Sequence, residues 1–184
     1  MGSMNTFTGK RIDPLEMRAE DVCLEDLAHA LSLLCRGGGH LRHFYSVGQH
    51  AINCMKEARA RGWPPRLQLA CLLHDAGEAY LADVIRPVKA HLSNYSAIEE
   101  AVMRRIWERY GLMNLSAEEN RRWRQIDDEM LCAECAALLA GAGDGRAPQL
   151  YARPDLTERQ WESVEKEFKE LACLLTAELG TAGA

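Results

Sequence analysis

An apolar run that ends in two potential metal ligands constrains this sequence more than any other feature. The run from Leu69 to Leu73 is too hydrophobic for a protein surface, and His74 and Asp75 follow it directly. Charged residues so close to a buried segment need partners, because burying an unpaired charge is costly. A metal ion with an anionic substrate would supply such partners. The next fourteen residues add two carboxylates and two cations: Glu78, Asp83, Arg86 and Lys89.

The composition is that of one globular domain. The chain has 184 residues, of which 47% are hydrophobic and 27% charged, and this is enough for one sizeable core. The net charge of −5 argues against binding to a nucleic-acid polymer, which normally needs a basic face. The seven cysteines fit a reducing cytoplasm better than a disulfide framework. With no apolar run as long as a membrane span and no signal peptide, we expect a cytoplasmic protein.

The first residues are interpreted as a cloning remnant. Met1-Gly2-Ser3 precedes a second methionine, Met4, and creates an accidental myristoylation pattern that we set aside. We therefore assign residues 1–4 to this remnant and residues 5–184 to a single domain.

Apolar residues recur at three- and four-residue intervals and no stretch alternates with a period of two, so the expected fold is all-α. Residues 5–20 are expected to form an extended lead-in. Loops are expected at 36–45, 83–92 and 141–154, where glycine or proline interrupts the pattern. The expected helices cover approximately residues 21–34, 46–61, 65–75, 96–110, 116–139 and 157–175. Three of them should begin at a capping box, formed by the pairs Ser96–Glu99, Ser116–Glu119 and Thr157–Gln160.

Two histidines and two aspartates are the candidate metal ligands. His74 and Asp75 would point about 100° apart on a regular helix, but they can converge where the chain reaches the edge of the core. His50 lies on an apolar face, where a lone histidine is more often a hydrogen-bonded core residue than a ligand. The candidate ligands are His50, His74, Asp75 and Asp127. The other histidines, for which the sequence offers no partner, are His29, His40, His43 and His91.

Helix geometry distinguishes Asp127 from its neighbour Asp128. At about 100° per residue, Asp127 and Glu134 fall within the apolar stripe that contains Trp123 and Met130, whereas Asp128 falls outside it. An aspartate that faces a core should be coordinated or paired, so Asp127 is the ligand candidate and Asp128 the solvated residue. Glu134 is expected to pair with a buried arginine or to support the site.

The segment Cys132-Ala-Glu-Cys135 also suggests zinc or redox chemistry. A single C-x-x-C inside a helix, without a second pair, is weak evidence for either, so we interpret it as core packing.

The order His50, His74-Asp75 and Asp127 resembles the pattern H…HD…D of the HD-domain metal-dependent phosphohydrolases. The segment Phe44–His50 resembles the Ser/Val-x-x-His segment of that family. The stretch His74–Lys89 is similar to H-D-x-x-E-x-x-x-x-D-x-x-x-P-x-K of its bacterial 5′-deoxynucleotidase branch. The resemblance covers about residues 20–140 and implies that residues 5–184 form an all-α, single-domain helical bundle of the HD-domain type.

The resemblance also implies a cofactor and a reaction. A ligand set without thiolates suits one divalent transition metal (Mn, Co, Fe, Ni or Zn) rather than a closed structural zinc site. Glu78 and Asp83 are expected to orient the attacking water or to protonate the leaving oxygen, and Arg36 and Lys89 to bind phosphate. Arg86 is interpreted as a surface or salt-bridge residue. The implied substrate is a nucleotide, most directly a (deoxy)nucleoside 5′-monophosphate whose phosphate ester is hydrolysed.

One departure from the family pattern keeps other functions open. In the deoxynucleotidases a tryptophan that helps to select deoxyribose follows the arginine, but here Gly37 follows Arg36, so no sugar preference is implied. The segments 36–40 and 44–47 look closer to phage and prophage-type HD phosphohydrolases, some of which are similar to enzymes that remove triphosphate from dATP. The alternatives are therefore a dNTP triphosphohydrolase and, from another class, a non-catalytic metal or nucleotide sensor. The family analogy suggests a homodimer, for which the amphipathic C-terminal helix could serve.

Overall fold

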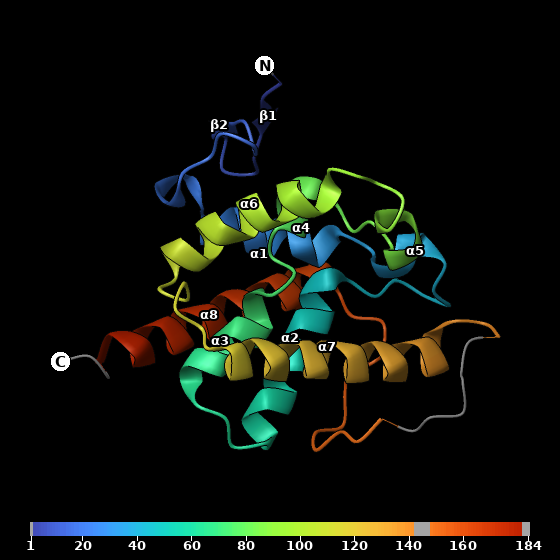
Figure 1. Cartoon of the computed structure of the whole chain (residues 1–184). Coiled ribbons are helices and arrows are strands. Elements are labelled where there is room, and N and C mark those ends of the chain that lie inside the picture. Colours follow the sequence, from blue (N-terminus) through green and yellow to red (C-terminus); the bar gives the residue numbers. More distant parts are fainter. Residues whose placement is uncertain (1, 142–147, 182–184) are drawn as a thin grey trace.

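The fold is all-α, as the apolar periodicity predicts (Figure 1). The structure, a computed structural model, describes residues 2–141 and 148–181. Its helices are α1 (Leu24–Leu33), α2 (Val47–Ala60), α3 (Pro65–Leu73), α4 (Glu78–Leu81), α5 (Arg86–Lys89), α6 (Tyr95–Arg109), α7 (Ala117–Leu138) and α8 (Trp161–Thr181). Two 3₁₀ segments, η1 (Ala19–Asp21) and η2 (Arg36–Gly39), precede α1 and α2.

The N-terminal lead-in contains a small hairpin that the sequence pattern does not predict. Strands β1 (Met4–Asn5) and β2 (Arg11–Ile12) pair in antiparallel fashion. The turn between them is fixed to α1, because the buried Asp26 carboxylate accepts hydrogen bonds from the Thr8 backbone N–H at 2.7 Å and from its hydroxyl at 3.0 Å. Strands of two residues are too short to show a period of two in the sequence.

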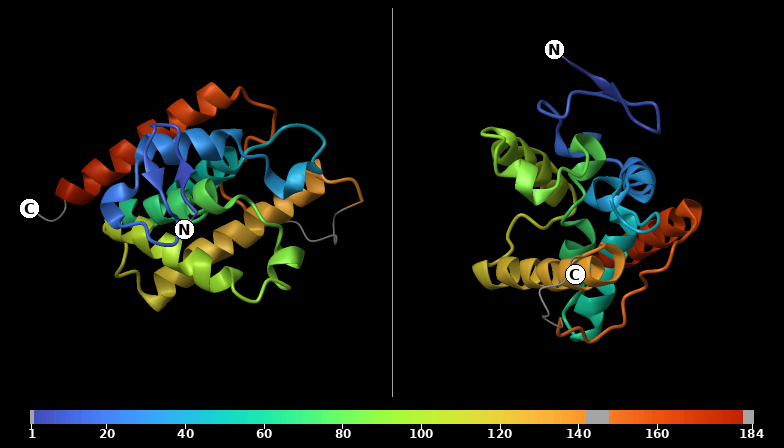
Figure 2. Two further views of the ribbon diagram at one scale, coloured as in Figure 1. Left: turned by 90° about the horizontal axis from the view of Figure 1, so that it is seen from above. Right: turned by 90° about the vertical axis from the view of Figure 1, so that its right-hand side faces the viewer.

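Helices α2 and α3 form the centre of the molecule, because both are buried on almost every side. Eleven of the fourteen residues of α2 and seven of the nine residues of α3 are buried. α2 packs against α1, α3, α7 and α8 (Figure 2). The sequence of α3 is largely apolar, as expected for a helix in a core, whereas α2 also buries polar residues such as His50 and Glu57. The apolar run 69–73 therefore brings His74 out at the end of a buried helix.

Close packing fixes the position of α2 at Gly48. A Cβ atom on this residue would lie 3.3 Å from the carbonyl oxygen of Leu31 on α1 and 3.2 Å from the side chain of Val164 on α8. A side chain here would force the neighbouring helices apart by a few tenths of an ångström, so glycine suits the point where α1, α2 and α8 meet. His50 lies two residues further along α2, so the same contact helps to position that side chain.

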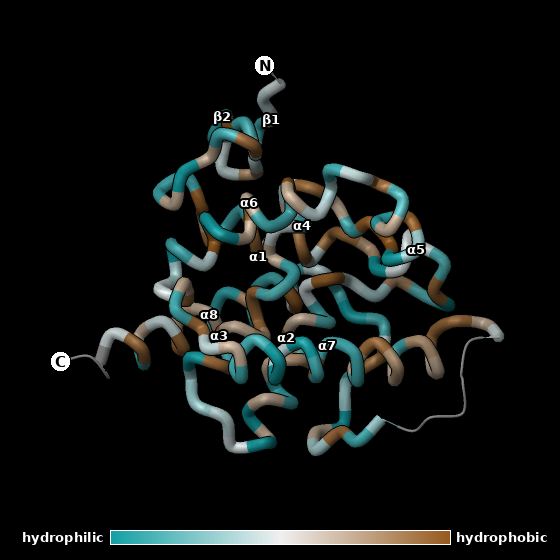
Figure 3. Tube along the Cα trace, viewed as in Figure 1, coloured by the Kyte–Doolittle hydropathy of each residue, from teal (hydrophilic) through white to brown (hydrophobic). Residues whose placement is uncertain are grey.

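Helices α6 and α7 run in opposite directions in front of the core, joined by residues 110–116 (Figures 1 and 2). Hydrophobic and hydrophilic residues alternate in groups along α7 (Figure 3), as expected for a helix with one buried face. The capping box at Ser116 and Glu119 is confirmed: each side chain bonds the other residue's backbone N–H, at 3.1 Å and 2.7 Å.

Two predicted capping boxes are wrong. α6 begins at Tyr95, so Ser96 lies inside its first turn instead of before it. α8 begins at Trp161, and the Thr157 hydroxyl donates instead to the carboxylate of Asp155 at 2.6 Å. α6 therefore begins slightly before the predicted start, and α8 begins after it, because the turns that precede them end at other residues. The expected loop at 83–92 also contains one helical turn, α5, whose first residues include Pro87.

Two further expectations concern the rest of the chain. The loop expected at 141–154 includes residues 142–147, which lie outside the described residues. None of the described helices combines the length and the apolar character that crossing a membrane requires.

We predict that Ser116→Ala lowers the free energy of unfolding by about 1 kcal/mol, because it removes the cap of α7. Ser96→Ala is the matched control and should change stability by less than about 0.5 kcal/mol, because Ser96 caps nothing. Urea denaturation monitored by circular dichroism measures both. Equal losses in the two variants would contradict the assignment of the caps.

Candidate metal centre

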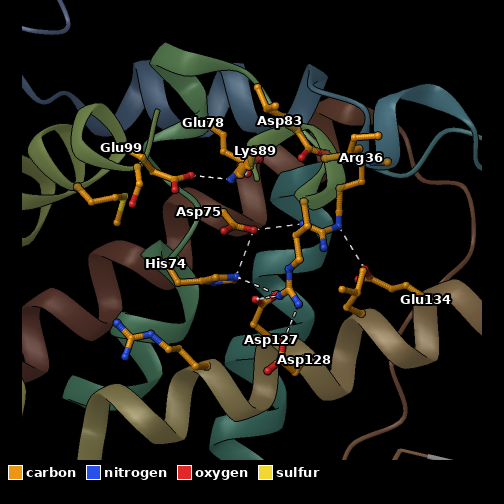
Figure 4. Close-up of a pocket in the computed structure, with 18 of the residues that line it drawn as sticks. Arg36, His74, Asp75, Glu78, Asp83, Lys89, Glu99, Asp127, Asp128 and Glu134 are labelled. Atoms are coloured by element: carbon orange, nitrogen blue, oxygen red, sulfur yellow. Dashed lines mark hydrogen bonds and ion pairs between the residues drawn. The ribbon is translucent and has the colours of Figure 1, made fainter. Parts of the chain in front are cut away.

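Four side chains from three segments converge at the edge of the core, as the sequence predicts. His50 comes from α2, His74 and Asp75 follow α3, and Asp127 comes from α7. One nitrogen or oxygen atom of each lies within 4.8 Å of the corresponding atoms of the others. Because α3 ends at Leu73 and the chain then turns, His74 and Asp75 can face the same point (Figure 4).

The spacing of these atoms fits a shared metal ion. Nε2 of His50 lies 3.2 Å from Nε2 of His74 and 3.3 Å from Oδ1 of Asp127, and Nε2 of His74 lies 3.2 Å from Oδ2 of Asp75. Adjacent ligands of a transition ion, each about 2.1 Å from it, are themselves about 3.0–3.4 Å apart. These three separations match this range. Two others, from Nε2 of His50 to Oδ2 of Asp75 and from Nε2 of His74 to Oδ1 of Asp127, are slightly longer at 3.6 Å.

Hydrogen bonds on the far sides of the two imidazoles leave both Nε2 atoms as acceptors. Nδ1 of His74 lies 2.8 Å from the carbonyl oxygen of Cys71, which can only accept, so this nitrogen carries the proton. Nδ1 of His50 lies 2.6 Å from the Glu134 carboxylate and donates to it in the same way. Two Nε2 lone pairs and two carboxylate oxygens then face one buried point. Such a donor set needs positive charge at its centre, which either protons or a bound metal ion can supply.

The electrostatics of the cluster lead to the same conclusion. Burial lowers the pKa of His74, but the neighbouring carboxylates of Asp75 and Asp127 outweigh it, and the pKa lies well above its usual value. Burial raises the pKa of both aspartates, but the two imidazoles outweigh it and hold them below their usual values. Protons therefore neutralise the cluster when no ion is bound. A metal must displace them, so its apparent affinity increases with pH.

Cys54 forms a second possible ligand group with His50 and His74. Its Sγ lies 3.5 Å from Nε2 of His50, one turn away on α2, a proximity that our sequence analysis missed although the spacing of four residues signals it. Burial, followed by the charges of Asp127 and Glu134, raises the pKa of the thiol well above its usual value. A thiol must lose its proton to bind a metal, so the aspartates are the better ligands.

Glu134 connects the ligands to the rest of the fold, as the sequence predicts. One carboxylate oxygen accepts from His50 Nδ1 and, at 2.7 Å, from the Tyr45 hydroxyl; the other accepts from Nε of Arg36 at 3.2 Å. All four residues are largely buried, and Asn53 donates to the Tyr45 hydroxyl at 2.9 Å. Histidine ligands commonly have such a carboxylate behind them, which orients the ring.

Two arginines pair with the ligand carboxylates. Nη1 of Arg36 donates to Oδ2 of Asp75 at 3.2 Å. Arg86 donates to Oδ2 of Asp127 and to Oδ1 of Asp128, both at 2.7 Å. Arg86 is thus a salt-bridge residue, as predicted, but its contact with Asp127 was not foreseen. The side chain of Asp128 is 64% exposed and that of Asp127 17%, which confirms the distinction made from the helix pattern.

The predicted catalytic and phosphate-binding residues surround the same point. Glu78 is buried, and its Oε2 has no hydrogen-bond partner among the described residues. Oδ2 of Asp83 accepts from the backbone N–H of Gly37 at 3.0 Å, and Gly37 has a left-handed conformation with φ 62°. Lys89 lies 2.6 Å from Glu99 and 3.7 Å from Glu78 (Figure 4).

A cleft of about 1090 Å³ opens over the metal-ligand cluster. Its walls come from η2, α5, α6 and α7, and it includes Arg36, Glu78, Asp83 and Lys89. Ligand sites are typically concave and combine apolar walls with a few convergent polar groups. This cleft is therefore the candidate substrate site.

The two cysteines of the C-x-x-C segment are not core residues, contrary to our interpretation. Cys132 and Cys135 are half-buried, and Cys135 lines the cleft. Part of the apolar face of α7 lines the cleft instead of packing in the core. A periodic apolar pattern in the sequence does not distinguish these two environments. Neither cysteine belongs to a potential metal group among the described residues.

Comparison with known proteins finds uncharacterized relatives. The chain is 39% identical over 112 residues to the uncharacterized protein YfdR of Escherichia coli, an alignment that covers 61% of this chain and 60% of that protein, less than two thirds of its length. It is 31% identical over 155 residues to the uncharacterized protein RCAP_rcc00048 of Rhodobacter capsulatus, covering 81% and 79% of the two chains. No protein-family profile matches the chain.

We predict that Glu134→Gln weakens Mn²⁺ binding about 10-fold or more, because the His50 ring loses the carboxylate that orients it. Glu165→Gln is a matched control: Glu165 is also buried and lies 3.0 Å from a histidine, His29, but on the other side of the core. Isothermal titration measures both affinities. An unchanged affinity in Glu134→Gln would contradict its supporting role.

The pH dependence of the free energy of unfolding tests whether the Glu78 carboxyl group is protonated in the folded protein. Burial, with the charges of Asp75 and Asp83, raises its pKa to about 9. The positive charges of Arg36 and Lys89 offset only part of this. Between the unfolded value of 4.5 and this folded value, the unfolded state loses the proton that the folded state keeps. The contribution of Glu78 to stability is therefore complete below pH 4.5 and is lost as pH rises towards 9.

We accordingly predict that the free energy of unfolding of the metal-free wild type, measured relative to that of Glu78→Gln, falls as the pH rises. The fall should be up to about 1.4 kcal/mol per pH unit. Urea denaturation in chelator at pH 5, 6, 7 and 8 measures it. Glu100→Gln, which alters an exposed glutamate, is the control. A difference that stays constant with pH would show that Glu78 is ionised in the folded protein.

Proposed function

The chain belongs to the family of the uncharacterized Rhodobacter capsulatus protein RCAP_rcc00048, and we propose that it is a metal-dependent phosphohydrolase acting on nucleotide phosphate esters. The most direct substrate is a (deoxy)nucleoside 5′-monophosphate. The observation that carries the proposal is the convergence of four acceptor atoms, from His50, His74, Asp75 and Asp127, at the floor of a cleft large enough for a nucleotide. The resemblance of the sequence to HD-domain enzymes supports it.

The four ligands would hold one divalent transition ion. When bound, such an ion polarises a phosphoryl oxygen and makes a hydroxide nucleophile available near neutral pH. The protein contributes the fixed positions of the ligands. Glu134 holds the His50 ring, and Arg86 holds the second oxygen of Asp127. Nitrogen and carboxylate ligands without a thiolate suit hydrolysis at an exchangeable site better than a purely structural role.

Glu78 is suited to donate a proton to the leaving oxygen. Its raised pKa keeps the carboxyl protonated at neutral pH, and its Oε2 has no hydrogen-bond partner among the described residues. General acids in enzymes are commonly tuned upward by burial in this way. Asp83 has a positioning role, because it holds the backbone of Gly37 next to Arg36.

Arg36 and Lys89 are suited to receive the phosphate. Both line the cleft. Arg36 pairs with the candidate ligand Asp75, and Lys89 pairs with Glu99 and lies 3.7 Å from Glu78. A phosphate adds negative charge that these cations stabilise, and the planar guanidinium can bind two of its oxygens. Their pairing with acids keeps both cations in place before the substrate arrives.

Turnover of nucleotides by the metal-loaded protein tests the proposal. Protein reconstituted with Mn²⁺ or Co²⁺ is incubated with ribo- and deoxynucleoside mono- and triphosphates, and the products are separated by chromatography. We expect inorganic phosphate and nucleoside from the monophosphates. Release of intact triphosphate would move the assignment to the triphosphohydrolase alternative. Metal binding without any turnover would favour the sensor.

We predict that Asp75→Asn and Asp127→Asn each lower kcat/KM by at least about 100-fold, because the metal supplies several kcal/mol of transition-state stabilisation. Asp128→Asn changes the adjacent, exposed carboxylate and should stay within about threefold of wild type. Full turnover in either of the first two variants would refute the ligand assignment.

A further inference from the structure

One end of the cleft has a different character from the metal-ligand cluster. It lies next to the connection between α6 and α7, and aromatic and thioether side chains line it with two arginines. These residues, which we call the aromatic end, are Met103, Arg104, Trp107, Met113, Trp123 and Arg124. Helices α6 and α7 run in opposite directions (Figure 1), and the residues of the aromatic end come from the C-terminal half of α6, the N-terminal half of α7 and the connection between them.

The two arginines of the aromatic end differ from the other cations of the cleft. Arg36, Arg86 and Lys89 all form ion pairs with carboxylates. Arg104 and Arg124 have no carboxylate partner in the described part of the chain. Cations without a carboxylate partner at the rim of a cleft can hydrogen-bond a ligand without first breaking an ion pair.

Trp123 joins the aromatic end to the metal-ligand cluster. Its ring lies 5.7 Å from the His74 ring, and the Arg124 guanidinium lies over it at 4.8 Å. On α7, Trp123 precedes Asp127 by one turn, about 6 Å along the helix axis. A group bound against Trp123 is thus separated from the metal ligands by a distance that a pentose can bridge.

These properties match one chemical group. A nucleobase has a flat aromatic face that stacks on tryptophan, an apolar face that packs against methionine, and an edge with hydrogen-bond acceptors. Arginine only donates, so Arg104 and Arg124 favour a base edge that carries acceptors, as guanine does. A sugar phosphate without a base would leave this end of the cleft unfilled.

We propose that the aromatic end of the cleft is the nucleobase subsite, in which Trp107 and Trp123 contact the base and Arg104 hydrogen-bonds its edge. The inference rests on the proposed function, because it assumes that the phosphate lies at the metal centre. It goes further in giving the orientation of the substrate: the base lies towards the connection of α6 and α7, and the phosphate towards Arg36. The base therefore contributes to substrate affinity.

Trp107 is the residue to change, because it lines the aromatic end without contacting a metal ligand in any described interaction. We expect Trp107→Leu to raise KM for guanosine 5′-monophosphate about 10-fold, from the loss of stacking, with little change in kcat. For ribose 5-phosphate, which has no base, KM should not change. Trp107→Phe keeps an aromatic face and should restore most of the affinity. Equal effects of Trp107→Leu on both substrates, or none, would overturn the subsite.

Arg104→Ala gives a second test that does not depend on Trp107, which packs partly against the core. Arg104 is exposed, so the variant should fold normally, and we expect it to weaken GMP binding several-fold. Arg109→Ala, on the same helix but outside the cleft lining, is the control. Equal effects of the two arginine variants would contradict the role of Arg104.

Binding of free guanosine to metal-free protein separates this inference from the proposed function. Isothermal titration should detect guanosine in wild type and weaker binding in Trp107→Leu, whether or not any substrate is hydrolysed. Binding that depends on Trp107 in a protein without turnover would keep the subsite and refute the hydrolase. Turnover of GMP that is insensitive to Trp107 and Arg104, with no guanosine binding, would keep the hydrolase and refute the subsite.

Discussion

The arrangement of the site depends on acceptor atoms that are forced together where burial limits their solvation: the His74 ring is almost fully buried, and the side chains of Asp75 and Asp127 are 21% and 17% exposed. Nε2 of His50 and of His74 lie 3.2 Å apart, and each imidazole uses its Nδ1 proton elsewhere, on Glu134 and on Cys71. Two aspartates add negative charge at the same point. Without a cation these groups would repel one another, so protons or a metal must lie between them. The ion pairs of Arg36 and Arg86 reduce the remaining charge.

The fold supplies this arrangement by burying two helices almost completely. Because α2 and α3 are surrounded by other helices, His50 and the end of α3 have fixed positions, and α7 places Asp127 against them. The chain turns directly after Leu73, which lets the neighbours His74 and Asp75 face the same point. A substrate would bind and react in the cleft above this rigid base, and the walls of that cleft include α5, α6 and α7.

Local sequence patterns predict the parts of the site that depend on helix periodicity. The position of Asp127 within the apolar stripe of α7 distinguishes it from Asp128, and the same stripe predicts that Glu134 pairs with a buried arginine. Patterns fail where two distant segments meet. The contact of Arg86 with Asp127 joins α5 to α7, and no spacing within either segment reveals it. The capping boxes at Ser96 and Thr157 fail because neighbouring turns decide where those helices begin.

Anomalous diffraction from crystals soaked with Mn²⁺ would show directly whether the four acceptor atoms bind one ion. We predict a single strong peak about 2.1 Å from His50 Nε2, His74 Nε2, Asp75 Oδ2 and Asp127 Oδ1. Such a peak would show that the four acceptors form one metal centre. A peak beside Cys54 instead, or no peak within the cleft at a saturating concentration of the ion, would contradict it.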